Sequence, residues 1–101
     1  MTNEDSKMIK SCGNIFKDLG FDNVEAENLH IRSLLMLEIE RYIKQQGLTQ
    51  FEAAKRLGIT PPRVASLLSG KLDSFTIDTL VNMLVRVGSR VDVVIQLQKA
   101  A

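Results

Sequence analysis

The spacing of hydrophobic residues along this chain changes once, close to residue 89. From residue 22 to residue 88, apolar positions recur three and four residues apart, which predicts helices with one buried face. After that point apolar and polar positions mostly alternate in RVDVVIQLQ, which predicts one β-strand whose apolar face is Val91, Val93, Ile95 and Leu97. The pattern therefore predicts a mostly α-helical chain with a C-terminal β-strand.

The first long helix has recognisable signals at both ends. Asp22 or Asn23 is the expected N-cap, with Glu25 completing the capping pattern. The helix is expected to run to Gln46, because Gly47 then falls in the C′ position, where glycine commonly ends a helix. Its predicted core stripe consists of Leu35, Ile39, Tyr42 and Ile43. A second buried surface is expected around two leucines that lie off this stripe, Leu34 and Leu37.

A shorter helix is predicted at residues 49–57. Thr49 followed by Glu52 three residues later forms a capping box, and Gly58 closes the helix. Its inner face is expected to be small, because it consists of Ala53, Ala54 and Leu57. Such a face allows another helix to approach closely.

The next helix is predicted at residues 61–69 and begins with two prolines. Thr60 is its expected N-cap, so Pro61 and Pro62 fall at N1 and N2. Amides at these positions have no partner inside a helix, so proline loses nothing there, and its fixed φ suits the first turn. The double proline therefore indicates a helix start. Inward-facing residues are Val64, Leu67 and Leu68, and Gly70 is the expected end.

A fourth helix and an N-terminal arm complete the predicted organisation. The fourth helix is expected to be capped by Thr76 or Ser74 and closed by Gly88, with a stripe of Ile77, Leu80, Leu84 and Val87. Residues 1–21 form an arm that is expected to pack on the domain, because a free tail would rarely keep two phenylalanines. The predicted divisions are this arm, a domain at 22–88 and a terminal strand at 89–101.

The spacing of the two short helices is that of a helix-turn-helix. Gly58-Ile59-Thr60 separates them, with the glycine permitting a sharp turn and Ile59 expected to cover the core beneath it. In such a motif the second helix presents its first turn to the major groove of DNA. A plain helical bundle also contains short helix pairs joined by tight turns, so spacing alone leaves both interpretations open.

The net charge of the whole chain does not support nucleic-acid binding, but the distribution of charge along the chain does. The formal net charge of +1 gives no overall basic signal. Residues 1–48 carry eight acids and six bases, whereas residues 49–101 carry four acids and seven bases. Within 49–71 the single acid is Glu52, against four bases: Lys55, Arg56, Arg63 and Lys71. This basic patch suits a DNA-facing surface, although patches of this size are also common on solvated surfaces.

Little in the sequence suggests catalysis, metal binding or a cofactor. Cys12 is the only cysteine, which excludes an internal disulfide and fits a reducing cytosol. His30 is the only histidine, so neither a metal site nor a catalytic thiol pair is expected, and no glycine-rich phosphate loop is present. The N-terminus lacks the apolar core of a signal peptide, and the longest apolar stretch is too short to cross a membrane. We therefore expect a soluble, cytoplasmic protein that is not an enzyme.

A family resemblance strengthens the helix-turn-helix hypothesis. The segment GLTQFEAAKRLGITPPRVASLLSGK resembles the lambda-repressor/Cro-like family, often called XRE, in its LTQ, its alanine-containing helix, its LGI, its V-x-x-L and its closing Gly-Lys. The resemblance covers roughly residues 35–88. GNIFKDLGF before the long helix and VDVVIQ after the last one also resemble the frame of small HigA-like antitoxins. The resemblance to the XRE family implies a lambda-repressor-like helix-turn-helix bundle that binds double-stranded operator DNA.

The resemblance also implies roles for individual residues. Gln50 is expected to bind a phosphate, and Lys55, Arg56 and Lys71 suit further phosphate contacts that position the domain without reading sequence. Thr60, Pro61, Pro62, Arg63, Ser66 and Lys71 are expected to face the groove. Arg63 is the best candidate for a bidentate contact with guanine O6 and N7. The prolines depart from the glutamines common in relatives and offer apolar contact alone, which predicts modest base specificity and more dependence on DNA shape.

The terminal strand raises the question of partners, because a lone strand needs a ladder. It could pair with the same strand of a second subunit, giving a homodimer, or with residues 14–17 of its own chain. Three functions remain open. The chain could be an antitoxin that binds a small toxin and represses its own operon, a stand-alone repressor of phage type, or an assembly module that does not bind DNA.

Overall fold

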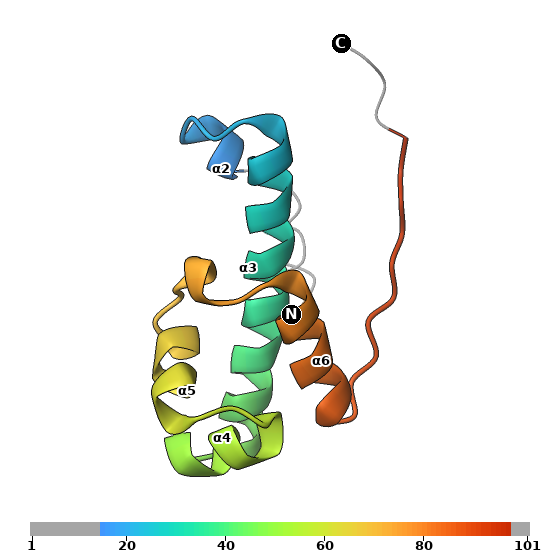
Figure 1. Cartoon of the computed structure of the whole chain (residues 1–101). Helices are drawn as coiled ribbons and strands as arrows, with labels where there is room; N and C mark the ends of the chain where they lie inside the picture. Colours follow the sequence, from blue (N-terminus) through green and yellow to red (C-terminus); the bar gives the residue numbers. More distant parts are fainter. Residues whose placement is uncertain (1–14, 98–101) are drawn as a thin grey trace.

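The computed structural model describes residues 15–97, and this part of the chain consists of helices joined by short turns (Figure 1). The elements are α2 (Ile15–Asp18), α3 (Asn23–Gln46), α4 (Gln50–Leu57), α5 (Pro61–Leu68), the 3₁₀ turn η1 (Leu72–Ser74) and α6 (Ile77–Arg86). The long helix α3 is the axis of the bundle: α2 packs near its start, while α5 and α6 pack along it and α4 packs on both of them (Figure 1).

The ends of α3 and α6 confirm the predicted capping and decide between its alternatives. The Asp22 side chain accepts a hydrogen bond from the Glu25 amide at 2.8 Å, so Asp22 is the N-cap of α3. Gly47 follows in the left-handed region, with a φ of 62°, and ends that helix. Thr76 caps α6 by accepting from the Thr79 amide at 3.2 Å, which excludes Ser74 from that role.

The core is one cluster to which every helix from α3 to α6 contributes a narrow stripe. Ile39 and Ile43 are buried as predicted, but Leu35 and Tyr42 are only partly buried, and Met36 is buried on the same helix. The other buried members are Ala53, Ala54, Leu57, Val64, Leu67, Phe75, Leu80, Met83 and Leu84. Each large side chain buried in this way contributes about 1.5–3 kcal/mol relative to an exposed one.

The connection between α5 and α6 is more structured than the sequence predicts. It contains η1 and then Phe75, whose side chain is only 1% exposed. Arg32 of α3 donates from Nη1 to the Leu72 carbonyl at 2.7 Å and to the Phe75 carbonyl at 3.3 Å. These two bonds hold the connection against the long helix.

The predicted C-terminal β-strand is wrong, because residues 15–97 contain no strand. Residues 89–97 continue from the end of α6 as an extended segment, and no backbone hydrogen bond joins 91–97 to another described segment (Figure 1). The physical reason is the lack of a ladder partner: residues 15–17, expected as one option, belong to the helix α2. Consequently Val93, Ile95 and Leu97 are 75%, 90% and 97% exposed.

The described part of the arm packs on the domain as a short helix. Helix α2 contacts α3, and the rings of Phe16 and Phe21 meet edge to face with centroids 6.2 Å apart. Cys12 and the rest of the arm up to residue 14 lie outside the described residues. Between residues 15 and 97, no helix is long and apolar enough to cross a membrane.

Candidate nucleic-acid interface

The turn between α4 and α5 depends on Gly58 in two ways. Gly58 has a φ of +76°, and its amide donates to the Ala54 carbonyl at 2.9 Å, as does the Ile59 amide at 3.0 Å. A Cβ at position 58 would also lie 2.7 Å from Nε of Arg86, which passes over the turn from the end of α6. A side chain here would therefore meet both backbone strain and a steric clash.

Helix α4 begins with the capping box that the sequence predicts. Thr49 Oγ1 accepts from the Glu52 amide at 3.1 Å, and Glu52 Oε1 accepts from the Thr49 amide at 2.9 Å. The bond from the Thr49 backbone stabilises the ionised carboxylate and lowers the pKa of Glu52 below its ordinary value of 4.5. Two first-turn donors are satisfied in this way, which fixes where α4 starts.

Helix α5 begins differently, because its first turn has no amide to offer. Pro61 and Pro62 occupy N1 and N2 as predicted, and the Arg63 amide donates to the Thr60 carbonyl at 3.0 Å. The Thr60 side chain makes no cap hydrogen bond, so its exposed hydroxyl is free for an outside partner. Helix N-termini commonly bind anions through free amides. In α5 the prolines remove two of these amides, so side chains must supply more of any such contact.

Gln50 links the first turns of the two helices. Its Nε2 donates to the Pro61 carbonyl at 2.9 Å, across a sequence separation of 11 residues. A side-chain amide nitrogen carries two hydrogens, so one remains for a phosphate oxygen. The residue expected to bind a phosphate thus also ties α4 to the prolines of α5.

Arg63 does not extend freely into solvent. It is partly buried, and its Cζ lies 4.4 Å from the centroid of the Phe75 ring. At this distance the guanidinium is attracted to the electron-rich face of the ring. Ser66, one turn further along α5, is also partly buried.

The remaining expected phosphate ligands fall into two groups. Lys55 and Lys71 are exposed. Arg56 donates from Nη1 to the Tyr42 hydroxyl at 3.2 Å, and this bond raises the pKa of Arg56. One of its donors is therefore engaged on α3, while the others stay open to solvent.

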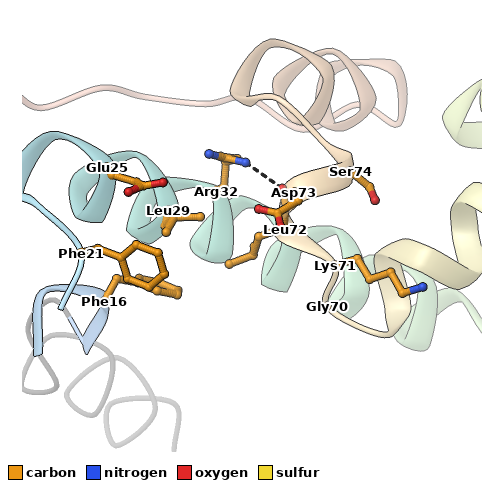
Figure 2. A pocket seen from close by; sticks show the side chains of 10 residues that line it. All are labelled: Phe16, Phe21, Glu25, Leu29, Arg32, Gly70, Lys71, Leu72, Asp73 and Ser74. Carbon is orange, nitrogen blue, oxygen red and sulfur yellow. Dashed lines mark hydrogen bonds between the residues drawn. The ribbon is translucent and has the colours of Figure 1, made fainter. Parts of the chain in front are cut away.

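Lys71 also borders a cavity of about 510 Å³ between the arm, α3 and the segment that leaves α5. Figure 2 shows Phe16, Phe21 and Leu29 on one side of this cavity and residues 70–74 on the other. The Lys71 side chain extends away from the two phenylalanines, and Arg32 reaches the Leu72 carbonyl (Figure 2).

Sequence reasoning missed Phe75 and Arg86 as parts of this region. Phe75 carries a signal that could have revealed it, because it stands at N′ of α6 with Leu80 at N4, the spacing of a hydrophobic staple. Both residues lie in the buried cluster. Arg86 has no comparable local signal, since its position over Gly58 follows from how α6 packs.

Comparison with known proteins agrees with this geometry. The family model described as a helix-turn-helix domain matches residues 15–96. The chain belongs to this helix-turn-helix family. A solved structure named as an XRE family transcriptional regulator is similar, with 31% identity over 76% of this chain and 90% of that chain, and a TM-score of 0.70. The helix-turn-helix is accordingly of the XRE type. A search of curated proteins finds no match.

Proposed function

We propose that this XRE-type helix-turn-helix protein binds double-stranded operator DNA through α4 and α5 and represses transcription. The observation that carries this proposal is the pair of short helices joined at Gly58, with Thr60 and Pro62 at the start of α5 exposed and with Lys55 and Lys71 exposed on the same helix pair and just after it. Membership of the family and the similarity to an XRE family transcriptional regulator support it. In this arrangement α5 enters the major groove.

The proposed contacts divide into positioning and reading. Gln50, Lys55, Arg56 and Lys71 bind phosphates, which places the domain on the duplex without reading sequence. Thr60, Pro61, Pro62, Arg63 and Ser66 face the bases, where Arg63 contacts a guanine and the prolines contact thymine methyl groups. Because α5 has no free amide in its first turn, its polar reading is done by side chains alone.

A binding experiment with two variants tests this division. A preferred duplex is first selected from a random-sequence library, and affinities for it and for a scrambled duplex are then measured over a range of salt. Arg63→Ala should cost about 1–3 kcal/mol on the selected duplex and relax the preference at one base pair. Lys55→Ala should weaken both duplexes alike and reduce the salt slope by about one phosphate contact. If neither variant alters DNA binding, α5 is not the reading helix. If the parent chain binds no duplex at all, an assembly role becomes the better hypothesis.

We also propose that the protein acts as a homodimer joined by the C-terminal segment. Val91, Val93, Ile95 and Leu97 supply the apolar contacts, and three of these four are largely exposed in the single chain. An exposed apolar run of this kind commonly marks an interaction surface. Two joined copies would place their α5 helices on half-sites about one DNA turn (~34 Å) apart.

Sedimentation analysis tests the dimer directly. Ile95→Asp should shift the protein to monomer at concentrations where the parent chain is dimeric. Phe51→Asp is the matched control, because Phe51 is another exposed apolar residue, 71% exposed, but lies on α4. Dissociation by both variants, or by neither, would rule out the C-terminal segment as the specific contact.

The finer role that we propose is the antitoxin of a type II toxin–antitoxin pair, which represses its own operon. Support comes from the frame resembling HigA-like antitoxins and from exposed apolar residues in the arm, such as Leu19. Induction of the adjacent small reading frame, with and without this chain, is the decisive assay. Growth arrest that this chain relieves is the expected result. A harmless neighbour would instead favour a stand-alone repressor.

A further inference from the structure

The contact between Arg63 and Phe75 joins the reading helix to a part of the chain with no expected role in DNA binding. Arg63 lies at N3 of α5, and Phe75 lies between η1 and α6. The guanidinium carbon is 4.4 Å from the ring centroid, and the ring is 1% exposed. The guanidinium carbon therefore lies over a ring that is otherwise enclosed by the core.

The edge of the same guanidinium remains unused. Within residues 15–97, no hydrogen bond joins the Arg63 guanidinium to a side chain or to a backbone carbonyl. Arginine carries its five N–H donors in the plane of the group, so a stacked face and a hydrogen-bonding edge can be used at the same time. A guanine needs two of these donors, for O6 and N7.

The ring is a fixed support rather than a mobile surface group. Its backbone carbonyl accepts from Arg32 Nη1 at 3.3 Å, and the neighbouring η1 carbonyl of Leu72 accepts from the same atom at 2.7 Å. Its side chain belongs to the central buried cluster. Phe75 is thus held by α3 on one side and by the core on the other.

We infer that Phe75 is a positioning residue for base reading, because it holds the Arg63 guanidinium by its face and leaves the edge directed to a guanine. This inference rests on the proposed DNA-binding function. A long arginine side chain loses conformational freedom when it binds, and one that is already held loses less. Phe75 consequently contributes to discrimination between base pairs without touching DNA.

A double-mutant cycle tests this role. Affinities are measured for a duplex selected from a random-sequence library and for versions in which one guanine at a time is replaced. Phe75→Leu removes the ring but keeps an apolar side chain, and it should reduce discrimination at one guanine by about threefold to tenfold. In the Arg63→Ala background the same change should cause no further loss. Phe75→Tyr keeps the ring and should retain discrimination.

Two controls separate positioning from general loss of structure. Leu80→Ala removes another buried side chain of the same cluster, and it should lower the melting temperature without lowering the discrimination ratio of the protein that remains folded. Arg63→Lys leaves the core untouched but replaces the planar group with a point charge. It should reduce discrimination with an unchanged salt slope, which checks that Arg63 reads the base. Phe75→Met also removes the ring but keeps a longer apolar side chain, so the test of Phe75 stands even if Phe75→Leu does not fold.

The outcomes distinguish this inference from the proposed function. If Arg63→Ala reduces discrimination but Phe75→Leu does not, Phe75 has no positioning role and DNA reading by Arg63 stands. An additive effect of Phe75→Leu in the Arg63→Ala background would also overturn the inference. If Arg63→Ala itself leaves discrimination unchanged, the proposed reading residue is wrong and the inference fails with it.

Discussion

The helix pair α4–α5 and the C-terminal segment 89–97 are both rich in aliphatic residues. In the single chain, those of the helix pair are largely buried, whereas those of the C-terminal segment are largely exposed. Ala53, Leu57 and Val64 are buried against α3 and α6, and the start of α4 is closed by a capping box. In the C-terminal segment, Ile95 and Leu97 are almost fully exposed, and no backbone hydrogen bond joins 91–97 to another described segment. The apolar pattern identifies residues that favour burial, but the rest of the chain decides whether burial is available.

The largest expected effect separates the two regions by stability. Leu57→Ala should lower the free energy of unfolding by about 2–5 kcal/mol, because Leu57 is 1% exposed in the centre of the cluster. Leu97→Ala should change it by less than about 0.5 kcal/mol when the protein is dilute enough to be monomeric. Urea unfolding at low protein concentration provides both values. Similar losses in the two variants would mean that the C-terminal segment is packed within one chain.

A second pair of variants examines the turn at Gly58, which joins α4 to α5 and allows the two helices to pack together. Gly58 and Gly70 both have a φ of +76°, but only a Cβ at Gly58 meets another atom, Nε of Arg86 at 2.7 Å. Gly70→Ala should cost about 1–2 kcal/mol from backbone strain alone. Gly58→Ala should cost more, and Arg86→Ala should recover the excess. Thermal unfolding of the three single variants and of the Gly58→Ala/Arg86→Ala double variant decides this. Equal losses at both glycines would show that the arginine moves aside freely.

The caps of the two helices provide a smaller contrast. Thr49→Ala removes a cap hydrogen bond and should cost about 0.5–2 kcal/mol of stability. Thr60→Ala removes none, so its stability cost should be close to zero, while its affinity for DNA should fall because the free hydroxyl is proposed to face the bases. Measuring unfolding and DNA affinity for both variants shows whether each threonine caps its helix or contacts DNA. A stability loss at Thr60 as large as that at Thr49 would contradict the assignment.

The smallest expected effect is on the stability of the fold at acidic pH. The pKa of Glu52 is lowered in the folded state, so its ionised form stabilises the fold at pH values above 4.5. That contribution is lost as the pH falls below 4.5 and through the lower folded value. Glu52→Gln should flatten this part of the stability profile, measured by urea unfolding. An unchanged profile in Glu52→Gln would show that the hydrogen bond from the Thr49 amide to Glu52 does not contribute to stability.

Sequence patterns predict the local features of the fold well, and the reason is physical. Asp22, Thr49, Thr76 and the two prolines act within one helical turn, so a few neighbouring letters contain the whole signal. The prediction of the C-terminal strand was wrong because alternating apolar residues indicate only one strand of a ladder. The described residues contain no second strand to pair with it.

The same limit applies to the candidate site. The turn at Gly58 and the helix start at the prolines could be predicted because both depend on local backbone conformation. The closeness of Arg86 to Gly58 could not be predicted, because it depends on how α6 packs. The contact of Gln50 with Pro61 spans 11 residues and that of Arg56 with Tyr42 spans 14, so both depend on how the helices pack. The contact of Arg63 with the Phe75 ring likewise joins two sides of a turn whose path the sequence does not specify.

The two prolines of α5 have a consequence for the kinetics of recognition. Proline restricts the backbone of the unfolded chain as well as that of the helix, so less conformational entropy is lost when the first turn of α5 forms. The turn is therefore ordered before DNA arrives, and no folding step is required on binding. Association should then proceed by docking of a rigid element, at a rate governed by diffusion, orientation and charge.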